Sequence, residues 1–159
     1  MMNKFNLLKY AIDYLSKYNS GKKHLEKILK AKITRLTKNK RERFELYNQI
    51  NQVLIKLEKN NLINDNIFVE SKINLFVSQG KSRRFIENYL IQKGIEKFIF
   101  EEKIKEFEET NYDWEKNCAL IFAKKKKLFN TNIEYEKKLS KMARAGFPYE
   151  ICKEILNID

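Results

Sequence analysis

The chain has 159 residues, of which 43% are hydrophobic and 13% aromatic, and it carries a formal net charge of +12. This length and apolar content suffice for one folded domain or a short array, and they exclude a disordered chain. Four glycines and one proline are too few for a turn-rich β-sandwich or barrel. No apolar run approaches the roughly 20 residues that cross a bilayer, and the first ten residues lack a signal-peptide pattern. We therefore expect a cytoplasmic protein without membrane contact.

The positive charge is concentrated in the first third of the sequence. Residues 1–61 hold 15 Lys and Arg against 5 Asp and Glu, residues 62–110 hold 8 against 9, and residues 111–159 hold 10 against 7. Within residues 20–43, ten basic residues accompany only two acidic ones. A block of this density attracts polyanions with an affinity that falls steeply with salt. The alternative is a solvated face whose lysines reflect an AT-rich genome.

Apolar residues recur at three- and four-residue spacing almost throughout, which predicts helices and no strands. The first helix is expected at about residues 3–18. Ser20 is the expected N-cap of the second helix, and Thr37 that of a long third helix. The third helix should end at Asn60 and Asn61, because asparagine tolerates left-handed backbone. Its expected buried stripe consists of Leu46, Tyr47, Ile50, Val53, Leu54 and Leu57.

The middle of the chain predicts three more helices with recognisable caps. Asn64 is the expected N-cap of the fourth helix, which should end at Gly80. Ser82 is the expected N-cap of the fifth, which should end at Gly94. The sixth helix has the apolar stripe Phe100, Ile104 and Phe107.

The last third also predicts three helices. The seventh runs into the lysine run at residues 124–127, which wraps a full turn, so at least one lysine should reach past the core. After a break at residues 130–132, an eighth helix should end at Gly146, and Pro148 should occupy the first turn of the ninth. The stripe of the seventh helix is Trp114, Cys118, Ile121 and Phe122.

A turn followed by helices recurs three times along the chain. The clearest copy is residues 80–104 (GKSRRFIENYLIQKGIEKFIFEEKI), with looser copies at residues 20–33 and 132–156. Units of this size cannot bury their apolar faces alone and stack on their neighbours. We therefore predict an all-α fold, an elongated, curved array of three tandem three-helix repeats that suits an extended partner. The repeats are expected at residues 1–61, 62–110 and 111–159.

Groups that could support catalysis are scarce. The sequence has no phosphate-binding glycine loop, no His-Glu-x-x-His and no Cys-x-x-Cys. His24, the sole histidine, is flanked by lysines and is interpreted as a solvated residue. Cys118 and Cys152 lack metal-ligand spacing and are interpreted as small hydrophobic residues without a disulfide. The acidic cluster in residues 101–109 is typical of a solvated face, with docking of a basic protein surface as the alternative. We predict no enzymatic activity, no cofactor and no metal site.

Basic residues at matching places in the three repeats are the candidate contacts for phosphate or for an acidic partner. Arg83 and Arg84 follow the expected N-cap Ser82, where cations oppose the helix dipole. This placement favours a binding role for at least one of them over plain solvent exposure. The full candidate set for binding a partner or nucleic acid is Lys22, Lys23, Lys27, Lys30, Lys81, Arg83, Arg84, Lys124, Lys125, Lys138, Lys141 and Arg144.

Three stretches resemble the RecX family of bacterial regulatory proteins. Residues 61–72 (NLINDNIFVESK) resemble the family's helix-opening signature, and residues 80–95 (GKSRRFIENYLIQKGI) resemble its middle repeat. Residues 145–156 (AGFPYEICKEIL) resemble its Arg-Gly-Phe terminal signature, although Ala145 stands where a second Arg is common. The first repeat is recognisable over residues 11–29. The order and spacing of these stretches cover most of the chain.

The resemblance implies a small, all-helical protein that binds the RecA recombinase and its filament on single-stranded DNA. It implies a monomeric, non-catalytic modulator that restrains the ATPase and strand-exchange activities of RecA in homologous recombination, DNA repair and the SOS response. Double-stranded DNA is a further candidate ligand. The alternative that the residues leave open is a basic helical module that binds nucleic acid directly, without RecA.

Overall fold

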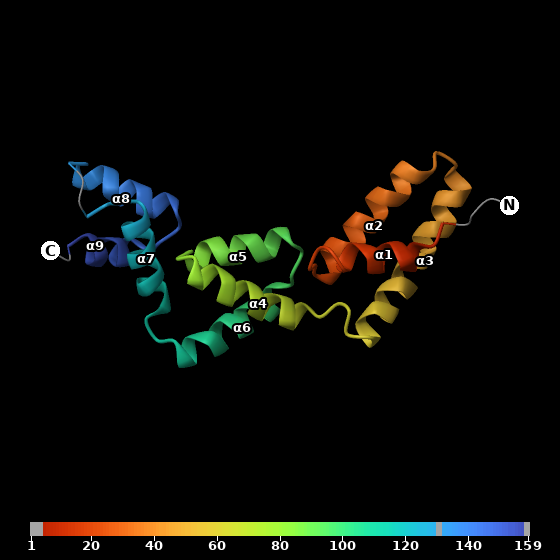
Figure 1. The fold of residues 1–159 in the computed structure, drawn as a ribbon, viewed down its shortest axis with the longest axis horizontal. Helices are drawn as coiled ribbons and strands as arrows, with labels where there is room; N and C mark the ends of the chain where they lie inside the picture. The colour runs from red at the N-terminus through yellow and green to blue at the C-terminus, as the bar shows by residue number, and fades with distance from the viewer. Residues whose placement is uncertain (1–4, 130–131, 158–159) are drawn as a thin grey trace. The chain divides into compact units, whose positions relative to one another are not determined.

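The computed structural model describes residues 5–129 and 132–157, and within these ranges the chain forms nine helices and no strand (Figure 1). The predicted all-α class is therefore confirmed. None of the helices in the described ranges is long and apolar enough to cross a lipid bilayer. The helices are α1 (Leu7–Leu15), α2 (Lys22–Leu36), α3 (Lys40–Lys59), α4 (Asp65–Ser78), α5 (Arg83–Gln92), α6 (Lys97–Thr110), α7 (Trp114–Lys125), α8 (Tyr135–Arg144) and α9 (Tyr149–Leu156).

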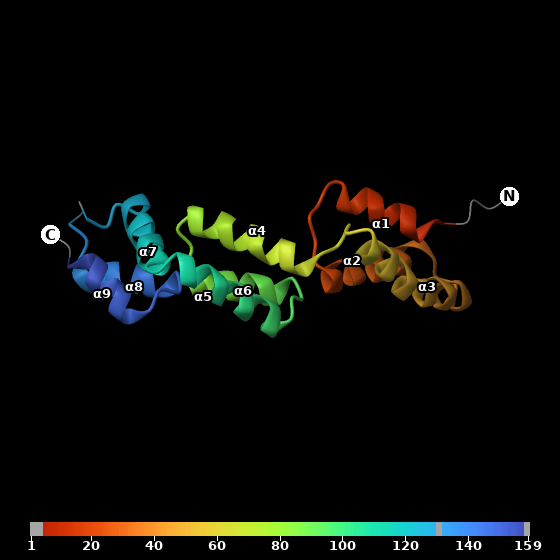
Figure 2. The same ribbon diagram turned by 90° about the horizontal axis from the view of Figure 1, so that it is seen from below.

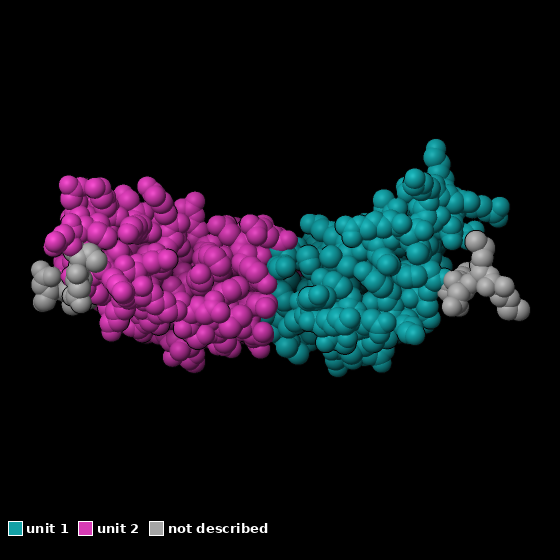
Figure 3. All heavy atoms as spheres, turned by 45° about the horizontal axis from the view of Figure 1, so that its top comes forward, with its two compact units in different colours: residues 1–68, 93–95 teal, residues 69–92, 96–159 magenta. Residues whose placement is uncertain are grey.

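The chain divides into two compact units, which Figure 3 shows in different colours. The first unit contains residues 1–68 and 93–95, and the second contains residues 69–92 and 96–159. Helix α4 therefore begins in the first unit, and most of it belongs to the second. The division into three repeats remains a prediction.

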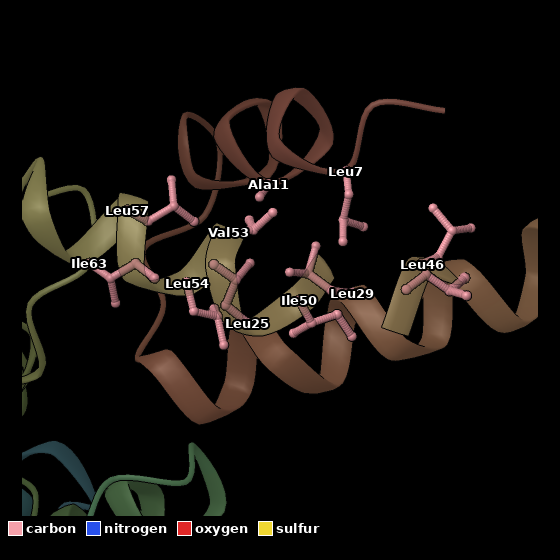
Figure 4. Packing of buried hydrophobic residues seen from close by; sticks show 11 residues of the cluster. Leu7, Ala11, Leu25, Leu29, Leu46, Ile50, Val53, Leu54, Leu57 and Ile63 are labelled. Atoms are coloured by element: carbon pink, nitrogen blue, oxygen red, sulfur yellow. The ribbon is translucent and has the colours of Figure 1, made fainter. Parts of the chain in front are cut away.

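In the first unit, α1 lies against α2 and α3, and α2 packs along α3 (Figures 1 and 2). Apolar side chains from the three helices point into one core (Figure 4). Ala11, Leu25 and Leu29 are fully buried there. Each fully buried leucine stabilises the fold by roughly 1.5–3 kcal/mol. Tyr47 is the one member of the predicted α3 stripe that is not buried, because its hydroxyl oxygen lies 2.9 Å from Thr34 Oγ1 at an exposed position.

In the second unit, α7, α8 and α9 pack against one another, and α5 packs against α6. Phe76 of α4 makes edge-on ring contacts with Phe85 and Tyr89 of α5, at centroid distances of 5.2 and 4.8 Å. Cys118 and Cys152 are buried free thiols, as predicted. Burial raises the pKa of the Cys118 thiol to about 11, so this thiol stays protonated at neutral pH.

Two of the expected N-caps are correct and two lie nearby. The side-chain oxygens of Asn64 and Ser82 accept the backbone N–H groups of Ile67 and Phe85, as capping requires. Thr37, however, is the C-cap of α2, and the N-cap of α3 is Asn39. The Asn39 side chain accepts two backbone N–H groups at the start of α3, and this double contact decides where the helix begins.

Both ends of the chain show similar shifts of helix start. The expected start at Asn3 lies outside the described residues, and α1 begins at Leu7 because the Asn6 side chain accepts the backbone N–H of Lys9. Pro148 is the N-cap of α9 rather than its first residue. Its backbone is extended, with ψ at 145°, so the helical turn starts only with the next residue.

Most of the residues expected to end a helix in a left-handed conformation do so. Asn61, Gly80, Gly94 and Gly146 all have positive φ, as predicted. The lysine run is different, because α7 ends inside it and Lys127 takes a left-handed conformation with a φ of 55°, close to the 53° of Asn61. All four lysines are exposed, and Lys126 Nζ lies 6.0 Å from the centroid of the Phe122 ring. Of the expected break at residues 130–132, the first two residues lie outside the described ranges.

Candidate functional site

In the first unit, the start of α2 meets the first residue of α4 and the segment that follows α5. Asp65 Oδ1 accepts the backbone N–H of Lys22 at 2.9 Å. A Cβ atom on Gly94 would approach the Lys23 Cβ within 2.8 Å, and one on Gly21 would approach the Ile95 Cδ1 within 2.7 Å. These contacts define the first junction, which consists of Gly21, Lys22, Lys23, Asp65, Gly94 and Ile95.

The second unit has the same arrangement at the start of α5. Glu115 Oε1 accepts the backbone N–H of Arg83 at 3.0 Å. A Cβ atom on Gly146 would approach Ser82 Oγ within 2.6 Å and the Arg84 Cβ within 3.1 Å. The buried Ser82 hydroxyl donates to the carbonyl of Ala145 at 2.7 Å. The second junction consists of Ser82, Arg83, Arg84, Glu115, Ala145 and Gly146.

Each junction supplies a helix cap from a distant part of the sequence. The first N–H groups of a helix have no intrahelical partner, and a carboxylate there also interacts favourably with the helix dipole. Asp65 lies in the first turn of α4, and Glu115 in the first turn of α7. The prediction that Ser20 caps α2 is wrong for this reason. Gly21 is the N-cap, the Asp65 carboxylate binds the N–H of the first helical residue, and the buried Ser20 hydroxyl lies 3.2 Å from the Gly21 carbonyl oxygen.

The first junction is surrounded by positive charge. Partial burial, followed by the charges of Lys93 and Lys27, lowers the pKa of His24 below its ordinary value of 6.5. His24 is partly buried. Lys23 and Lys27 are exposed, and Lys27 forms no ion pair with any other residue that the structure describes. An anionic ligand at this surface would therefore meet at least the charge of Lys27, which no described carboxylate neutralises.

At the second junction, the two adjacent arginines play different parts. Arg83 Nε lies 2.9 Å from Glu87 Oε1, and Arg83 Nη1 lies 2.7 Å from Glu108 Oε1. The hydrogen bond that Arg83 donates to Glu87, together with the charge of Glu108, raises the pKa of the Arg83 guanidinium. Arg84 is exposed and forms no ion pair within the described ranges. Arg83 thus holds its own unit together, and Arg84 is the residue available to a partner.

Four further candidates are also engaged within their own unit. Lys22 Nζ lies 2.8 Å from Glu58 Oε2, and Lys30 Nζ lies 2.6 Å from Glu26 Oε1. Lys125 Nζ donates to the carbonyl of Gln79 at 2.9 Å, and Lys81 Nζ lies 4.7 Å from the centroid of the Phe85 ring. The candidates whose side chains form no ion pair, hydrogen bond or ring contact with a described residue are Lys27, Arg84, Lys124, Lys138, Lys141 and Arg144.

Helix α8 contributes an exposed basic face to the second unit. Lys137, Lys141 and Arg144 follow the i, i+4, i+7 spacing of one helix face, and all three are exposed. The fully buried Met142 lies on the opposite side of the helix. Helix α8 ends at Arg144, and Gly146, two residues later, lies beside the side chain of Arg84. Lys137 was missed by the sequence prediction, and its Nζ lies 3.5 Å from Glu134 Oε2.

The acidic cluster of α6 is divided among several partners. Glu108 Oε1 accepts from Arg83 and from the indole N–H of Trp114, and Glu106 Oε2 pairs with Lys103 Nζ at 2.8 Å. Across the described part of the chain, no group of three or more acidic, histidine or cysteine side chains is arranged to hold a metal ion. The candidate binding residues are therefore exposed cations, near the start of α2 in the first unit and near the start of α5 and on α8 in the second.

No protein-family model matches this chain. The regulatory protein RecX of Myxococcus xanthus is 30% identical over 155 residues, which cover 92% of this chain and 82% of that protein. The regulatory protein RecX of Finegoldia magna is 34% identical over 128 residues, covering 76% of this chain and 60% of that protein.

A solved structure agrees with these relatives on the fold. The crystal structure of RecX from Lactobacillus salivarius matches with a TM-score of 0.69 at 23% identity and covers 96% of each chain. The likeness in structure supports the all-α fold, and the identity to the Myxococcus protein extends over most of both sequences. On these grounds, the chain belongs to the RecX family of regulatory proteins.

Proposed function

We propose that this protein is a non-catalytic regulator that binds, as a monomer, the RecA filament assembled on single-stranded DNA. In this role it restrains the ATPase and recombination activities of RecA. The observation that carries the proposal is the 30% identity with the regulatory protein RecX of Myxococcus xanthus over 92% of this chain. The signature stretches at residues 61–72, 80–95 and 145–156 support it.

The proposal includes three tandem repeats, at residues 1–61, 62–110 and 111–159. Its support is the equivalence of the two junctions, because Asp65 and Glu115 each cap a helix that begins well before them in the sequence. Gly94 and Gly146 are equivalent in the same way, since each ends a helix with positive φ beside a basic residue. Repeats that share such a boundary cannot bury it alone.

The exposed cations are the proposed contacts to the filament. An acidic protein surface or DNA phosphate gains most from charges that have no partner within the chain, because paired charges are already screened. This condition favours Arg84, Lys141 and Arg144 in the second unit and Lys27 in the first. It removes Arg83 from the proposed contacts, since Glu87 and Glu108 already bind its guanidinium.

The direct test is the DNA-dependent ATPase rate of RecA from the same organism. We expect the added protein to slow ATP hydrolysis at fewer than one molecule per RecA subunit. An unchanged rate, with helicity confirmed by circular dichroism, would overturn the proposal.

A matched pair of variants tests the contact surface. Arg84→Gln should weaken the inhibition, because it removes an exposed cation that forms no ion pair with a described residue. Lys105→Gln should leave it unchanged, because Lys105 is likewise exposed and without an ion pair in the described ranges but lies among the acidic residues of α6. Equal inhibition by both variants would exclude Arg84. Reversing Arg83 and Arg84 together is a poorer test, because loss of Arg83 also breaks two ion pairs within the fold.

The alternative, a module that acts directly on nucleic acid, is favoured by the basic first third of the chain. A pull-down of purified RecA without DNA, set against a gel shift with naked DNA over a salt series, separates the two. Capture of RecA alone supports the filament regulator. A gel shift without any capture or ATPase effect supports the alternative.

A further inference from the structure

The turn that joins α2 to α3 in the first unit combines positive charge with an exposed aromatic ring. We call residues 35–44 the hairpin tip; it lies at the upper right of Figure 1. Five basic residues accompany a single acidic one in this range. None of them belongs to the candidate set derived from the repeats.

The tip is held in place by its own hydrogen bonds. Arg43 Nε donates to the carbonyl of Thr37 at 2.7 Å, and Arg43 Nη2 donates to the carbonyl of Thr34 at 3.1 Å. The Thr37 hydroxyl donates to Glu42 Oε2 at 2.5 Å. Arg43 and Glu42 are therefore occupied with closing the turn. This closure makes the tip an ordered platform rather than a loose loop.

The remaining cations of the tip are available to a ligand. Arg35, Lys38 and Lys40 are exposed and form no ion pair with another described residue. Arg41 Nε lies 3.5 Å from Glu45 Oε1, and 90% of the Arg41 side chain is exposed. A pair this open to water contributes little, so Arg41 can exchange its partner for a phosphate.

Phe44 places an aromatic face beside these cations. It is 65% exposed, and it lies one helical turn after Lys40 and Arg41 on the same side of α3. The ring of Tyr47 follows on that side, with its hydroxyl beside Thr34. Phe98 of α6 is the informative contrast, because it is 64% exposed but is followed one turn later by Glu101 and Glu102. Phe44 and Phe98 are thus almost equally exposed, but Phe44 lies among cations and Phe98 precedes two carboxylates.

We propose that the hairpin tip is a contact site for single-stranded nucleic acid, in which a base stacks on Phe44 and phosphates bind Lys38, Lys40 and Arg41. Single-stranded binding sites combine a cationic track with aromatic faces, because an unpaired base exposes its π-face. Duplex bases are already stacked and cannot use the ring. This inference does not depend on RecA, because its test uses naked DNA.

The test is the affinity of the full-length protein for a labelled oligo(dT), measured by fluorescence anisotropy at low salt. Phe44→Ala should weaken binding about tenfold, and Phe98→Ala should leave it unchanged. Phe44→Trp should retain affinity, and DNA should quench the new indole while Trp114, which is 5% exposed, stays constant. Equal effects of the two Ala variants, or no quenching, would overturn the stacking contact.

Two further measurements separate the ring from the charges. On an abasic strand, wild type and Phe44→Ala should bind equally, because no base remains to stack. The double variant Lys38→Gln/Lys40→Gln should reduce the slope of log affinity against log salt by about 0.7 for each lost phosphate contact. Lys56→Gln/Lys59→Gln is its control, since it makes the same charge change on α3 at least about 20 Å away. Identical slopes for both double variants would remove the tip from the site.

The same series distinguishes other occupants. If wild-type protein does not bind oligo(dT) at low salt, the proposed nucleic-acid site is wrong. If Phe44→Ala weakens the RecA inhibition but not oligo(dT) binding, the hairpin tip contacts protein and the nucleic-acid site is again wrong. If oligo(dT) binding responds as expected while RecA hydrolysis is unaffected by wild type, the tip proposal stands and the RecA proposal fails.

Discussion

The two junctions have the same geometry but different chemistry. In the second junction, the N-cap Ser82 contributes its own hydroxyl, which accepts the N–H of Phe85 and donates to Ala145. In the first junction the equivalent residue is Gly21, which has no side chain, and the cap of α2 comes from the Asp65 carboxylate. The space that a serine would occupy is filled by Ile95.

This difference indicates that the boundary can be built in two ways. The second junction satisfies its polar groups locally and binds Arg83 in ion pairs, which leaves Arg84 exposed. The first junction depends on packing and on one long-range carboxylate, and it is surrounded by lysines that raise the local potential. Matched substitutions in the two junctions should therefore lower the free energy of unfolding by different amounts.

The largest difference is expected from the glycines. Gly146→Ala should lower the free energy of unfolding by about 3 kcal/mol, because left-handed backbone costs alanine about 1–2 kcal/mol and the new Cβ displaces the Ser82 cap. Gly94→Ala should cost about 2 kcal/mol, since it meets Lys23 but breaks no hydrogen bond of comparable value. Gly21→Ala should cost about 1 kcal/mol, because its φ of −74° is ordinary and only the end of Ile95 and the Asp65 carboxylate, at 2.7 and 3.1 Å from the new Cβ, must shift. Urea unfolding followed by circular dichroism measures all three, and equal losses would contradict the comparison.

Removal of the acidic caps should destabilise the first junction more than the second, the reverse of the glycine substitutions. Asp65→Ala should cost about 1.5 kcal/mol, because α2 then has no capping side chain. Glu115→Ala should cost about 1 kcal/mol or less, because Ser82 still caps α5, and because burial raises the pKa of Glu115 and so penalises its charged form. Asp113→Ala is the control, since that side chain makes no capping hydrogen bond, and it should be nearly neutral. The same urea titration decides, and a larger loss for Glu115→Ala than for Asp65→Ala would show that Ser82 contributes little.

The first basic residue of each helix offers a smaller contrast. Arg83→Gln should cost about 1 kcal/mol, because it removes two ion pairs that are only partly exposed. Lys22→Gln should cost less than about 0.5 kcal/mol, because it removes one exposed pair with Glu58. Thermal unfolding in low and high salt checks both values. If Arg83→Gln lowered the stability by the same amount in low and in high salt, loss of the ion pairs would not be the cause.

The smallest effect is a pH dependence confined to the first junction. The folded protein lowers the pKa of His24, so between its ordinary value of 6.5 and the lowered value the unfolded chain binds a proton that the folded chain does not. Stability is therefore full above pH 6.5 and falls as the pH drops below it. His24→Gln should show a smaller loss between pH 7 and pH 5 in urea midpoints. A parallel decline in both proteins would assign the dependence to other groups.

Features that rest on neighbours in the sequence were accessible without a structure. Periodicity and local backbone preference predict the helices, the N-caps Asn64 and Ser82, and the left-handed ends at Asn61 and the three glycines. Capping and left-handed turns involve residues within one turn of each other, so the amino-acid order alone specifies them. The RecX resemblance rested on the same local signatures, and the relatives confirmed it.

Tertiary structure decided everything that joins distant segments. Asp65 caps a helix that begins 43 residues earlier, and Glu115 one that begins 32 residues earlier, so the local choice of Ser20 was wrong. Two adjacent arginines look alike in the sequence, yet only packing brings Glu108 to Arg83 and leaves Arg84 open. Whether a charge is available depends on which side chains the folded backbone brings within about 4 Å of it, and no pattern of neighbours contains that distance.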